Sequence, residues 1–303
     1  MKSEIELVVS ERISKYGIIS FSEYMDILLF HDSCGYYSSR DVFGRKGDFI
    51  TSPITSSLFG ASIANEFINL RDSITKPVIL EIGAGDGSLV VSIIEHLFNK
   101  KALPNKFYIM ETSEKLIELQ KMNIMKKIPK LNHIVEWVKH EDISGVNGLI
   151  VCNEFFDVLP TERFKIENKK FFQLFVGYEE DIKIQWEDKT NKLRDIFKNF
   201  KFYDILSKYN DYESEINLNY EGWVQKINNI LNTGVVFVVD YGYNMKEYFL
   251  PDRKTGTLVC MHNHQANFNP FQNIGYQDIS SFVNFSHLAY LFKRSKFEVS
   301  GYL

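Results

Sequence analysis

Three glycines and one acidic residue in a short stretch are the residues of this chain whose spacing most clearly indicates chemistry. Residues 78–82 are apolar except for Glu81, and Gly83, Gly85 and Gly87 follow at alternate positions. The apolar run predicts a buried parallel strand, and the apolar helical pattern after the glycines predicts a helix immediately beyond the turn. Glycine allows the backbone to approach a ligand closely, and a helix N-terminus offers free N–H groups. The stretch therefore predicts a ligand-binding turn between a strand and a helix.

The glycine spacing and Glu81 indicate which kind of ligand this turn binds. A dinucleotide-binding turn needs its third glycine at position 88, where this chain has Ser88. A carboxylate at the end of the strand repels a phosphate but attracts a cation. S-adenosylmethionine has no phosphate and carries an ammonium and a sulfonium, so it is the predicted ligand. Two alternatives stay open: a glycine-rich turn that serves only close packing, and a nicotinamide-dependent oxidoreductase, which the glycine spacing disfavours.

Strand and helix patterns alternate beyond this turn. The further predicted core strands are residues 106–110, 133–138, 148–152 and 235–239. This alternation predicts an α/β fold with a doubly wound parallel sheet, right-handed crossovers and ligands at the carboxyl ends of the strands. Glu111 follows the second strand, about two dozen residues after Gly87, where nucleotide-binding folds place a ribose-binding acid.

The chain on either side of this core has other patterns. An amphipathic segment closed by Gly17, and a capping box formed by Ser20 and Glu23, predict two N-terminal helices. From Thr161 the pattern changes to antiparallel strands and charged helices. The predicted parts are a helical N-terminal segment with a cofactor-covering loop (1–75), a Rossmann-like core (76–160), an α+β insertion after the fourth strand that caps the substrate (161–230), and the remainder of the core sheet (231–303).

Composition excludes several classes of function. A net charge of −4 over 303 residues gives no basis for a nucleic-acid surface. Cys34, Cys152 and Cys260 form no C-x-x-C motif, and His262 and His264 lack an evident third ligand, so no metal is expected. The first residues carry mixed charge without a long apolar run, so we expect neither a signal peptide nor a membrane span. A reducing compartment fits: the cytoplasm of a bacterium or the mitochondrial matrix of a eukaryote.

With these residues assembled, the chain resembles the MidA-like methyltransferases, a family that includes the mitochondrial arginine methyltransferase serving respiratory complex I assembly. Seven motifs occur in the family's order: GYY at 35–37, GDFITSP at 47–53, LEIGAGDG at 80–87, ETS at 111–113, NEFFDVLP at 153–160, DYG at 240–242 and DI at 278–279. The resemblance implies a class I fold that depends on S-adenosylmethionine, with a seven-stranded sheet whose last strand is antiparallel. It also implies a protein arginine as acceptor and a complex I subunit as partner.

The resemblance implies a set of cofactor contacts. They are Glu81, Gly83, Gly85, Gly87, Glu111, Asp142, Ile143, Asp48 and Thr51. The glycines let the backbone pass beneath the methionine part, and Glu81 orients its ammonium. Glu111 accepts hydrogen bonds from both ribose hydroxyls, or else caps the following helix. Asp142 and Ile143 border the adenine, although a plain loop acid is the alternative, and the loop at 47–53 either closes over the cofactor or is structural.

Asn153, Glu154 and Asp157 follow the fourth predicted core strand, where the transferred methyl is expected to point. Methyl transfer is an in-line displacement, so the enzyme mainly aligns donor and nucleophile in a dry pocket. An arginine acceptor is protonated and planar, so it needs carboxylates to hold it and to take its proton. Glu154 is the first candidate for that role and Asp157 the second. The alternative is that both acids cap the helix after the strand.

The sequence departs from the family pattern at three positions. Ile54 replaces a usual Glu, Tyr243 a usual His, and Val259 a common Arg. The sequence also ends at Leu303, earlier than the family pattern. These departures leave open a second function, a non-catalytic assembly factor for complex I that keeps the cofactor-binding fold. They concern the acceptor more than the cofactor, and the oligomeric state stays open.

Overall fold

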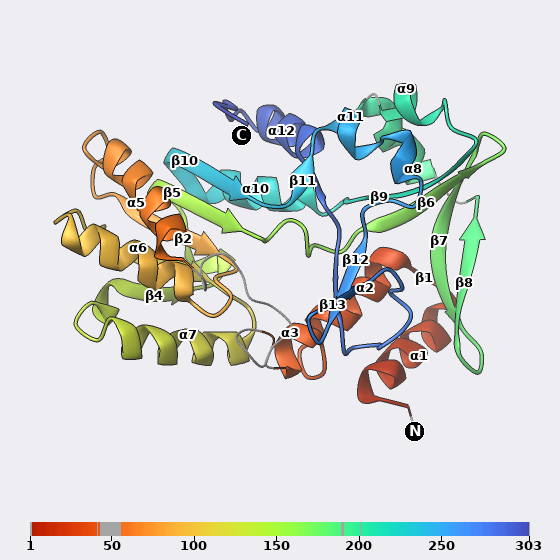
Figure 1. The fold of residues 1–303 in the computed structure, drawn as a ribbon, viewed down its shortest axis with the longest axis horizontal. Coiled ribbons are helices and arrows are strands. Elements are labelled where there is room, and N and C mark those ends of the chain that lie inside the picture. Colours follow the sequence, from red (N-terminus) through yellow and green to blue (C-terminus); the bar gives the residue numbers. More distant parts are fainter. Residues whose placement is uncertain (1, 41, 43–55, 189–190, 201, 303) are drawn as a thin grey trace. The chain divides into compact units, whose positions relative to one another are not determined.

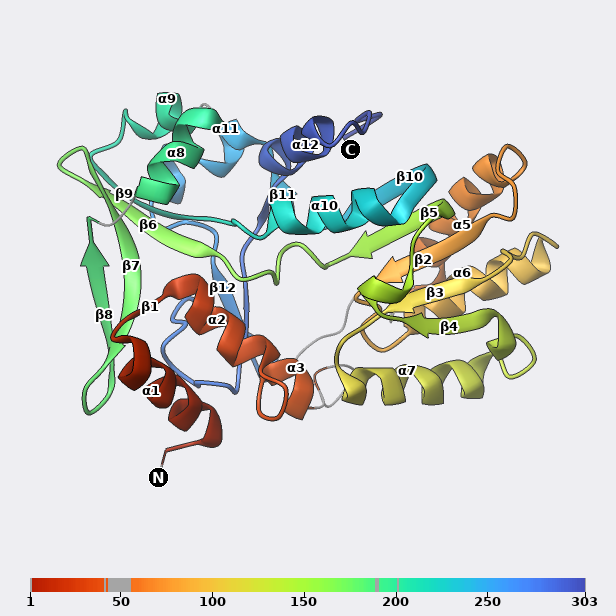
Figure 2. The same ribbon diagram turned by 180° about the vertical axis from the view of Figure 1, so that it is seen from behind.

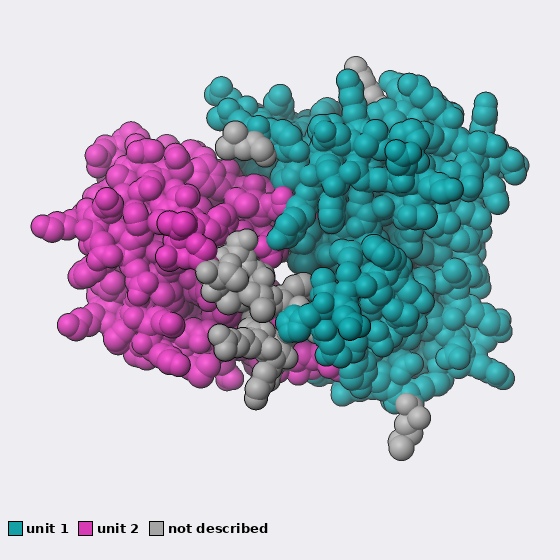
Figure 3. All heavy atoms as spheres, viewed as in Figure 1, with its two compact units in different colours: residues 1–36, 157–224, 241–303 teal, residues 37–156, 225–240 magenta. Residues whose placement is uncertain are grey.

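The computed structural model of the protein describes residues 2–40, 42, 56–188, 191–200 and 202–302 (Figures 1 and 2). The chain divides into two compact units. Unit 1 comprises Met1–Tyr36, Asp157–Val224 and Tyr241–Leu303, and unit 2 comprises Tyr37–Phe156 and Gln225–Asp240 (Figure 3). Each unit is therefore assembled from segments that are far apart in the sequence.

Unit 2 contains a parallel sheet with the strand order β10-β5-β2-β3-β4 (Figure 2). Its strands are β2 (Val78–Ile82), β3 (Phe107–Met110), β4 (Val135–Val138), β5 (Val146–Asn153) and β10 (Leu231–Val239). Every neighbouring pair is parallel. The chain places β3 and β4 on one side of β2 and then β5 and β10 on the other. This order confirms the predicted doubly wound sheet and puts its topological switch point between β2 and β5, where ligands bind in such sheets.

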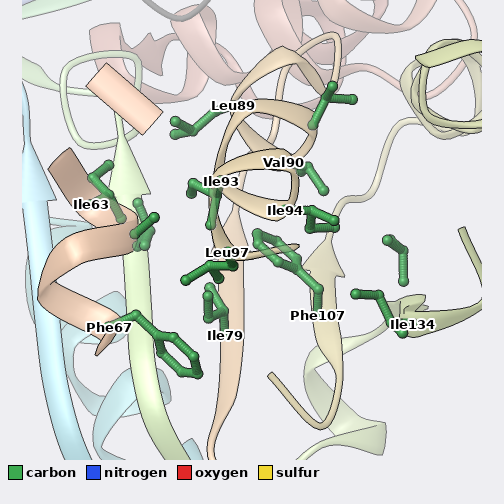
Figure 4. Packing of buried hydrophobic residues seen from close by; sticks show 14 of the residues in the cluster. Ile63, Phe67, Ile79, Leu89, Val90, Ile93, Ile94, Leu97, Phe107 and Ile134 are labelled. Carbon is green, nitrogen blue, oxygen red and sulfur yellow. The ribbon is translucent and has the colours of Figure 1, made fainter. Parts of the chain in front are cut away.

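One face of this sheet packs against helices α5 (Ser57–Arg71) and α6 (Ser88–Asn99), and α7 (Glu114–Lys127) adds to the same core. Val90, Ile94 and Leu97 are fully buried and recur at helical spacing along α6, so they present one apolar side. They lie in one cluster with Ile79 and Phe107 of the sheet (Figure 4). This packing holds β2, and with it the glycine turn, against α6.

The outer strand of the sheet differs from the sequence-based expectation. The pattern of residues 235–239 predicts a buried strand, but Val235 and Val239 of β10 are 38% and 37% exposed. The reason is that β10 is an edge strand, which pairs only with β5 in this sheet. The sheet described has five parallel strands, whereas the resemblance implied seven with an antiparallel last strand. The residues after Asp240 belong to unit 1 rather than to this sheet.

Unit 1 contains an antiparallel sheet with the order β1-β7-β6-β9, and β8 pairs with β7 beside this path. The strands are β1 (Ile19–Ser20), β6 (Glu162–Glu167), β7 (Lys170–Tyr178), β8 (Ile182–Glu187) and β9 (Asp211–Ile216). The β7–β8 pair confirms the antiparallel strands predicted at 171–178 and 182–186. Strands β6 and β9 were not predicted, because each has only two aliphatic or aromatic residues among its six, which is a weak strand pattern.

The two N-terminal helices form as predicted. Helix α1 (Glu4–Tyr16) ends at Gly17, whose φ of 89° suits glycine, and the Oγ of Ser20 caps α2 (Phe21–Phe30). A capping box between Ser3 and Glu6 starts α1 and was not predicted. Of the box predicted at α2, only the bond from the N–H of Glu23 to Ser20 is present, and the Glu23 carboxylate accepts from Arg12 instead. Local sequence therefore accounts for both ends of α1 and for the start of α2.

Further short elements complete the structure. The helices are α3 (Tyr36–Ser39), α8 (Asn191–Asn199), α9 (Phe202–Leu206), α10 (Tyr220–Ile230), α11 (Met245–Tyr248), α12 (Phe285–Arg294), η1 (Asn132–Ile134), η2 (His140–Asp142) and η3 (Pro251–Arg253). The strands are β11 (Gly242–Tyr243), β12 (Val259–His262), β13 (Gln265–Asn267), β14 (Asp278–Ser280) and β15 (Val283–Asn284). In unit 1, β11 pairs with β15, and β12 pairs with both β13 and β14. None of the helices described is long and apolar enough to cross a membrane.

Candidate active site

The parallel sheet of unit 2 collects the candidate residues at one edge. Because its strands all run in the same direction, the turns after them lie at the same edge of the sheet. The glycine turn follows β2, Glu111 follows β3, Glu154 follows β5 and Asp240 follows β10. The topological switch point thus places the glycine turn and Glu154 after adjacent strands.

The glycine turn adopts the backbone that only glycine readily takes. Gly83, Gly85 and Gly87 have φ angles of 72°, 53° and 82°. A Cβ on Gly83 would lie 3.0 Å from Cδ2 of Phe155, so this position is also sterically restricted. Gly87 is the N-cap of α6 and supplies no capping side chain. The turn therefore brings bare backbone and a helix N-terminus to the carboxyl end of β2, as predicted.

Glu81 is a buried acid with unused hydrogen-bonding capacity. It belongs to the central strand β2, whose two faces are both buried, and the residue is therefore only 2% exposed. Among the residues described, Oε2 of Glu81 has no hydrogen-bond partner. Burial, together with the nearby carboxylates of Asp86 and Glu111, raises the pKa of Glu81 to about 8. A buried carboxylate of this kind favours a cationic ligand, so the ammonium of S-adenosylmethionine fits it.

Glu111 lies near Glu81, and its oxygens are partly occupied. The backbone N–H groups of Thr112 and Ser113 donate to Oε1 at 2.8 and 3.0 Å, and Gln120 Nε2 donates to Oε2 at 3.3 Å. Burial raises the pKa of Glu111, and these three hydrogen bonds oppose that rise. Ser113 itself caps α7, so Glu111 orders the turn before the helix. Each carboxylate oxygen has two lone pairs, so Oε2 retains one for a ribose hydroxyl.

Glu154 lies directly after β5 in an unusual backbone conformation. Its φ is 47°, in the left-handed region that non-glycine residues rarely adopt, and its N–H donates to the carbonyl of Val239 at 2.8 Å. Oδ2 of Asp240 accepts from the N–H groups of Phe155 and Phe156 at 3.2 and 2.9 Å. Burial raises the pKa of Glu154. The end of β10 therefore holds the backbone around a desolvated carboxyl group.

The other predicted site residues lie in different environments. Asn153 is the last residue of β5 and is half-buried, whereas Asp157 belongs to unit 1, where its carbonyl accepts from the N–H of Ser281 at 2.9 Å. The three candidate catalytic residues are thus divided between the two units. Asp142 ends η2 after β4 and is exposed, and Ile143 beside it is half-buried. Asp48, Thr51 and Ile54 lie outside the described residues.

The two histidines considered as metal ligands take part in a hairpin. Asn263 and His264 form the turn between β12 and β13 with φ angles of 49° and 60°, and Nδ1 of His262 lies 2.6 Å from the carbonyl oxygen of Tyr276. Within the described part of the chain, no three His, Cys, Asp or Glu side chains are grouped so that they could hold a metal ion. The local contacts of His262 account for its position.

Two residues of this site were not singled out from the sequence. Asp240 was noted only as part of a motif, and its role in holding the turn after β5 depends on pairing between distant strands. Gln120 is fully buried and binds both the glycine turn and Glu111. The sequence did contain a signal for Gln120, because Leu116, Gln120 and Ile124 recur at helical spacing. An amide in such an apolar stripe requires polar partners.

A family model described as "Putative S-adenosyl-L-methionine-dependent methyltransferase" matches residues 58–303. The chain belongs to this family. S-adenosylmethionine is the family's cofactor, in agreement with the charge of the site at the glycine turn. The described part of the family match includes every strand of the parallel sheet and the residues around Glu81, Glu111 and Glu154.

Named relatives and solved structures agree with the family. The human mitochondrial protein arginine methyltransferase NDUFAF7 is 27% identical over 312 residues, which cover 91% of this chain and 66% of the human protein. The Caenorhabditis elegans homologue is 26% identical, over 93% of this chain and 70% of that protein. The chain therefore spans about two thirds of the length of these relatives. A Burkholderia thailandensis protein bound to S-adenosyl-homocysteine shares the fold, with a TM-score of 0.87 and 24% identity over 96% of this chain and 76% of that protein.

Proposed function

We propose that this chain is a protein arginine N-methyltransferase that uses S-adenosylmethionine. The observation that carries the proposal is the carboxyl group of Glu154, partly buried at the switch point of the sheet with a raised pKa and a strained backbone. Strained backbone at a ligand-binding edge is a feature of functional sites. The human and worm relatives are named as protein arginine methyltransferases, which supports the same acceptor.

Each candidate site residue described in unit 2 has a proposed role that follows from its chemistry. Glu81 binds the cofactor's ammonium, the glycine turn passes beneath its amino-acid part, and Glu111 accepts from the ribose. When bound, S-adenosylmethionine supplies an electrophilic methyl group. The carboxylate of Glu154 accepts hydrogen bonds from two N–H groups of the acceptor's planar guanidinium. It also takes the proton that the methylated guanidinium nitrogen loses. A raised pKa makes Glu154 a better proton acceptor than an exposed glutamate.

The acceptor protein is proposed to be a subunit of respiratory complex I. The family resemblance, which includes the arginine methyltransferase that serves assembly of that complex, supports this choice. The relatives named above are mitochondrial proteins, and the corresponding place for this chain is the mitochondrial matrix in a eukaryote or the cytoplasm in a bacterium. Tritiated S-adenosylmethionine, added to an extract of the source cells with the purified protein, labels the acceptor. Mass spectrometry of the labelled protein then identifies the side chain, and a label on a residue other than arginine contradicts the proposal.

Replacing Glu154 with glutamine tests its role. The amide keeps the size of the side chain but neither attracts the guanidinium nor accepts its proton, so we expect methyl transfer to fall by about 10²- to 10⁴-fold. Binding of S-adenosylhomocysteine, measured by calorimetry, is expected to change by no more than about threefold, because Glu81 and Glu111 are intact. Glu118→Gln, on the exposed side of α7, is the matched control and leaves both quantities unchanged. An active Glu154→Gln enzyme removes Glu154 from the mechanism.

A non-catalytic assembly factor is the second candidate. The residues at two of the family departures have structural partners: Tyr243 stacks on Phe282 with ring centroids 5.4 Å apart, and Val259 pairs with Ser280 in the β12–β14 ladder. The guanidinium of Arg253 also lies 3.7 Å from the Tyr243 ring centroid. Side chains engaged in this way are not available to bind an acceptor, which is the observation that favours this candidate. Loss of methylation in Glu154→Gln with normal cofactor binding excludes this candidate.

A further inference from the structure

Helix α7 contributes a buried amide, that of Gln120, to the edge of the parallel sheet where the glycine turn and Glu111 lie. Leu116, Gln120 and Ile124 form the buried stripe of the helix, and Gln120 is fully buried. An amide at such a position is stable only if its donors and acceptor are satisfied. In this protein they are satisfied by one group on β4 and by two groups that follow β2 and β3.

The hydrogen bonds of Gln120 connect the two ends of the site. Its Nε2 donates to the carbonyl of Gly85 at 3.0 Å and to Oε2 of Glu111 at 3.3 Å. Its Oε1 accepts from Nε1 of Trp137, on β4, at 2.8 Å. The indole therefore fixes which side of the amide carries the oxygen, and this leaves the NH2 group directed at both the glycine turn and Glu111.

Two further contacts strengthen this arrangement. Asn123, one turn later on α7, donates from Nδ2 to the carbonyl of Asp86 at 2.9 Å. The backbone and side chain of Gln120 also lie beneath Gly87, since a Cβ there would be 3.5 Å from its Cα and Cγ. The glycine turn is thus held by α7 at three successive points.

We propose that Gln120 is a positioning residue that sets the separation between the subsite for the cofactor's amino-acid end and the subsite for its ribose. Its amide is the direct bridge between the glycine turn and Glu111. A ligand that occupies both subsites gains from a preset separation, because the site need not be ordered during binding. A ligand that occupies only the adenosyl subsite gains much less. This inference rests on cofactor binding by the chain and is independent of the acceptor.

The test compares two ligands in one variant. Gln120→Met keeps the side-chain length but removes all three hydrogen bonds. By calorimetry, we expect the affinity for S-adenosylhomocysteine to fall about tenfold or more, and that for 5′-methylthioadenosine, which lacks the amino-acid end, by no more than about threefold. Glu118→Met, on the exposed side of the same helix, is the control and leaves both affinities unchanged. Equal losses for the two ligands overturn the proposal, because Gln120 would then act through Glu111 alone.

Trp137→Phe gives a second, milder test should Gln120→Met fold poorly. It removes the indole N–H that orients the amide and keeps an aromatic ring at the position, so we expect a loss of about threefold for S-adenosylhomocysteine and almost none for 5′-methylthioadenosine. An unchanged ratio of the two affinities contradicts the proposal. A wild-type protein that binds neither ligand contradicts the cofactor assignment itself, which separates the two failures.

Discussion

The surroundings of Glu81 differ strongly from those that its side chain has in water. It is an acid buried beside two other acids, and one of its oxygens has no partner among the described residues. An apolar residue at this position would pack against Ile109 and Val151, its neighbours across the sheet, without that penalty. Burial of Glu81 therefore does not serve the stability of the fold, and the proposed binding of the cofactor's ammonium gives a reason for it.

The raised pKa of Glu81 predicts how stability depends on pH. The folded-state pKa of about 8 lies above the ordinary value of 4.5, so the folded protein holds this proton more tightly than the unfolded chain. The protonated Glu81 contributes to the free energy of unfolding, and this contribution is fully present below about pH 4.5. It is lost as the pH rises to about 8, by about 1.4 kcal/mol per pH unit. Urea unfolding of the wild type and of Glu81→Gln at a series of pH values measures this loss of unfolding free energy.

The comparison with Glu81→Gln isolates this one group from the other titrating residues. Glutamine has the same shape and no charge, so the variant lacks this dependence. We expect the unfolding free energy of the wild type, relative to Glu81→Gln, to fall steadily between about pH 5 and about pH 8. A difference that stays constant over this interval shows that Glu81 titrates at an ordinary pKa.

At the scale of elements, the ends of β5 and β10 form one structural feature. The two strands pair in parallel from Val146 to Asn153 of β5, and the chain beyond β5 continues into Glu154 with its left-handed backbone. Asp240 closes this feature by accepting two backbone N–H groups. A carboxylate is the strongest acceptor available for such N–H groups, which suits an edge strand that has no second neighbour in the sheet.

Asp240→Ala tests this feature. The substitution leaves the N–H groups of Phe155 and Phe156 without that acceptor, so we expect the unfolding free energy to fall by about 2 kcal/mol. Asp240→Asn keeps an acceptor oxygen and is expected to lose less. Asp72→Ala is the surface control, since its side chain is 91% exposed and its ion pair with Arg71 is long, at 3.8 Å. If urea denaturation gives equal losses for Asp240→Ala and Asp72→Ala, Asp240 does not hold the turn.

At the scale of the whole molecule, the chain passes between the two units at four boundaries, and α10 continues across one of them. Unit 1 has its own buried polar group: Oε1 of Glu215 accepts from the N–H and Oγ1 of Thr257, at 2.6 and 2.5 Å, and from the hydroxyl of Tyr248, at 3.2 Å. These bonds join β9 to the loop before β12. All the proposed cofactor residues that the structure describes lie in unit 2.

Cofactor binding is therefore expected to stabilise the two units differently. At about 100 times its Kd, S-adenosylhomocysteine raises the unfolding free energy by about 2.7 kcal/mol. Hydrogen exchange is expected to slow most at the glycine turn and the first turn of α6, where backbone N–H groups are held by the ligand. Amides of β6 and β7 that exchange by local opening serve as the internal control. Slowing that is greater in those strands than at the glycine turn contradicts the placement of the site in unit 2.

Local patterns predicted much of unit 2. The apolar run that ends in alternating glycines predicted β2, its turn and α6, since those residues favour these conformations by themselves. Glu81 and Glu111 were identified because parallel strands must bring their carboxyl ends to one edge. The charged strands β6 and β9 were missed, since each has few apolar residues and their pairing with each other joins segments more than 40 residues apart along the chain.

The sequence by itself determined the strand–helix alternation, the glycine turn, the helix caps and the acids at the strand ends, because each depends on residues that are close together in the sequence. Only the tertiary structure decided that β10 lies at an edge, that Asp240 holds the turn after β5 and that Gln120 joins Gly85 to Glu111. These are contacts between distant segments, and their free energy arises only when burial removes water from both partners.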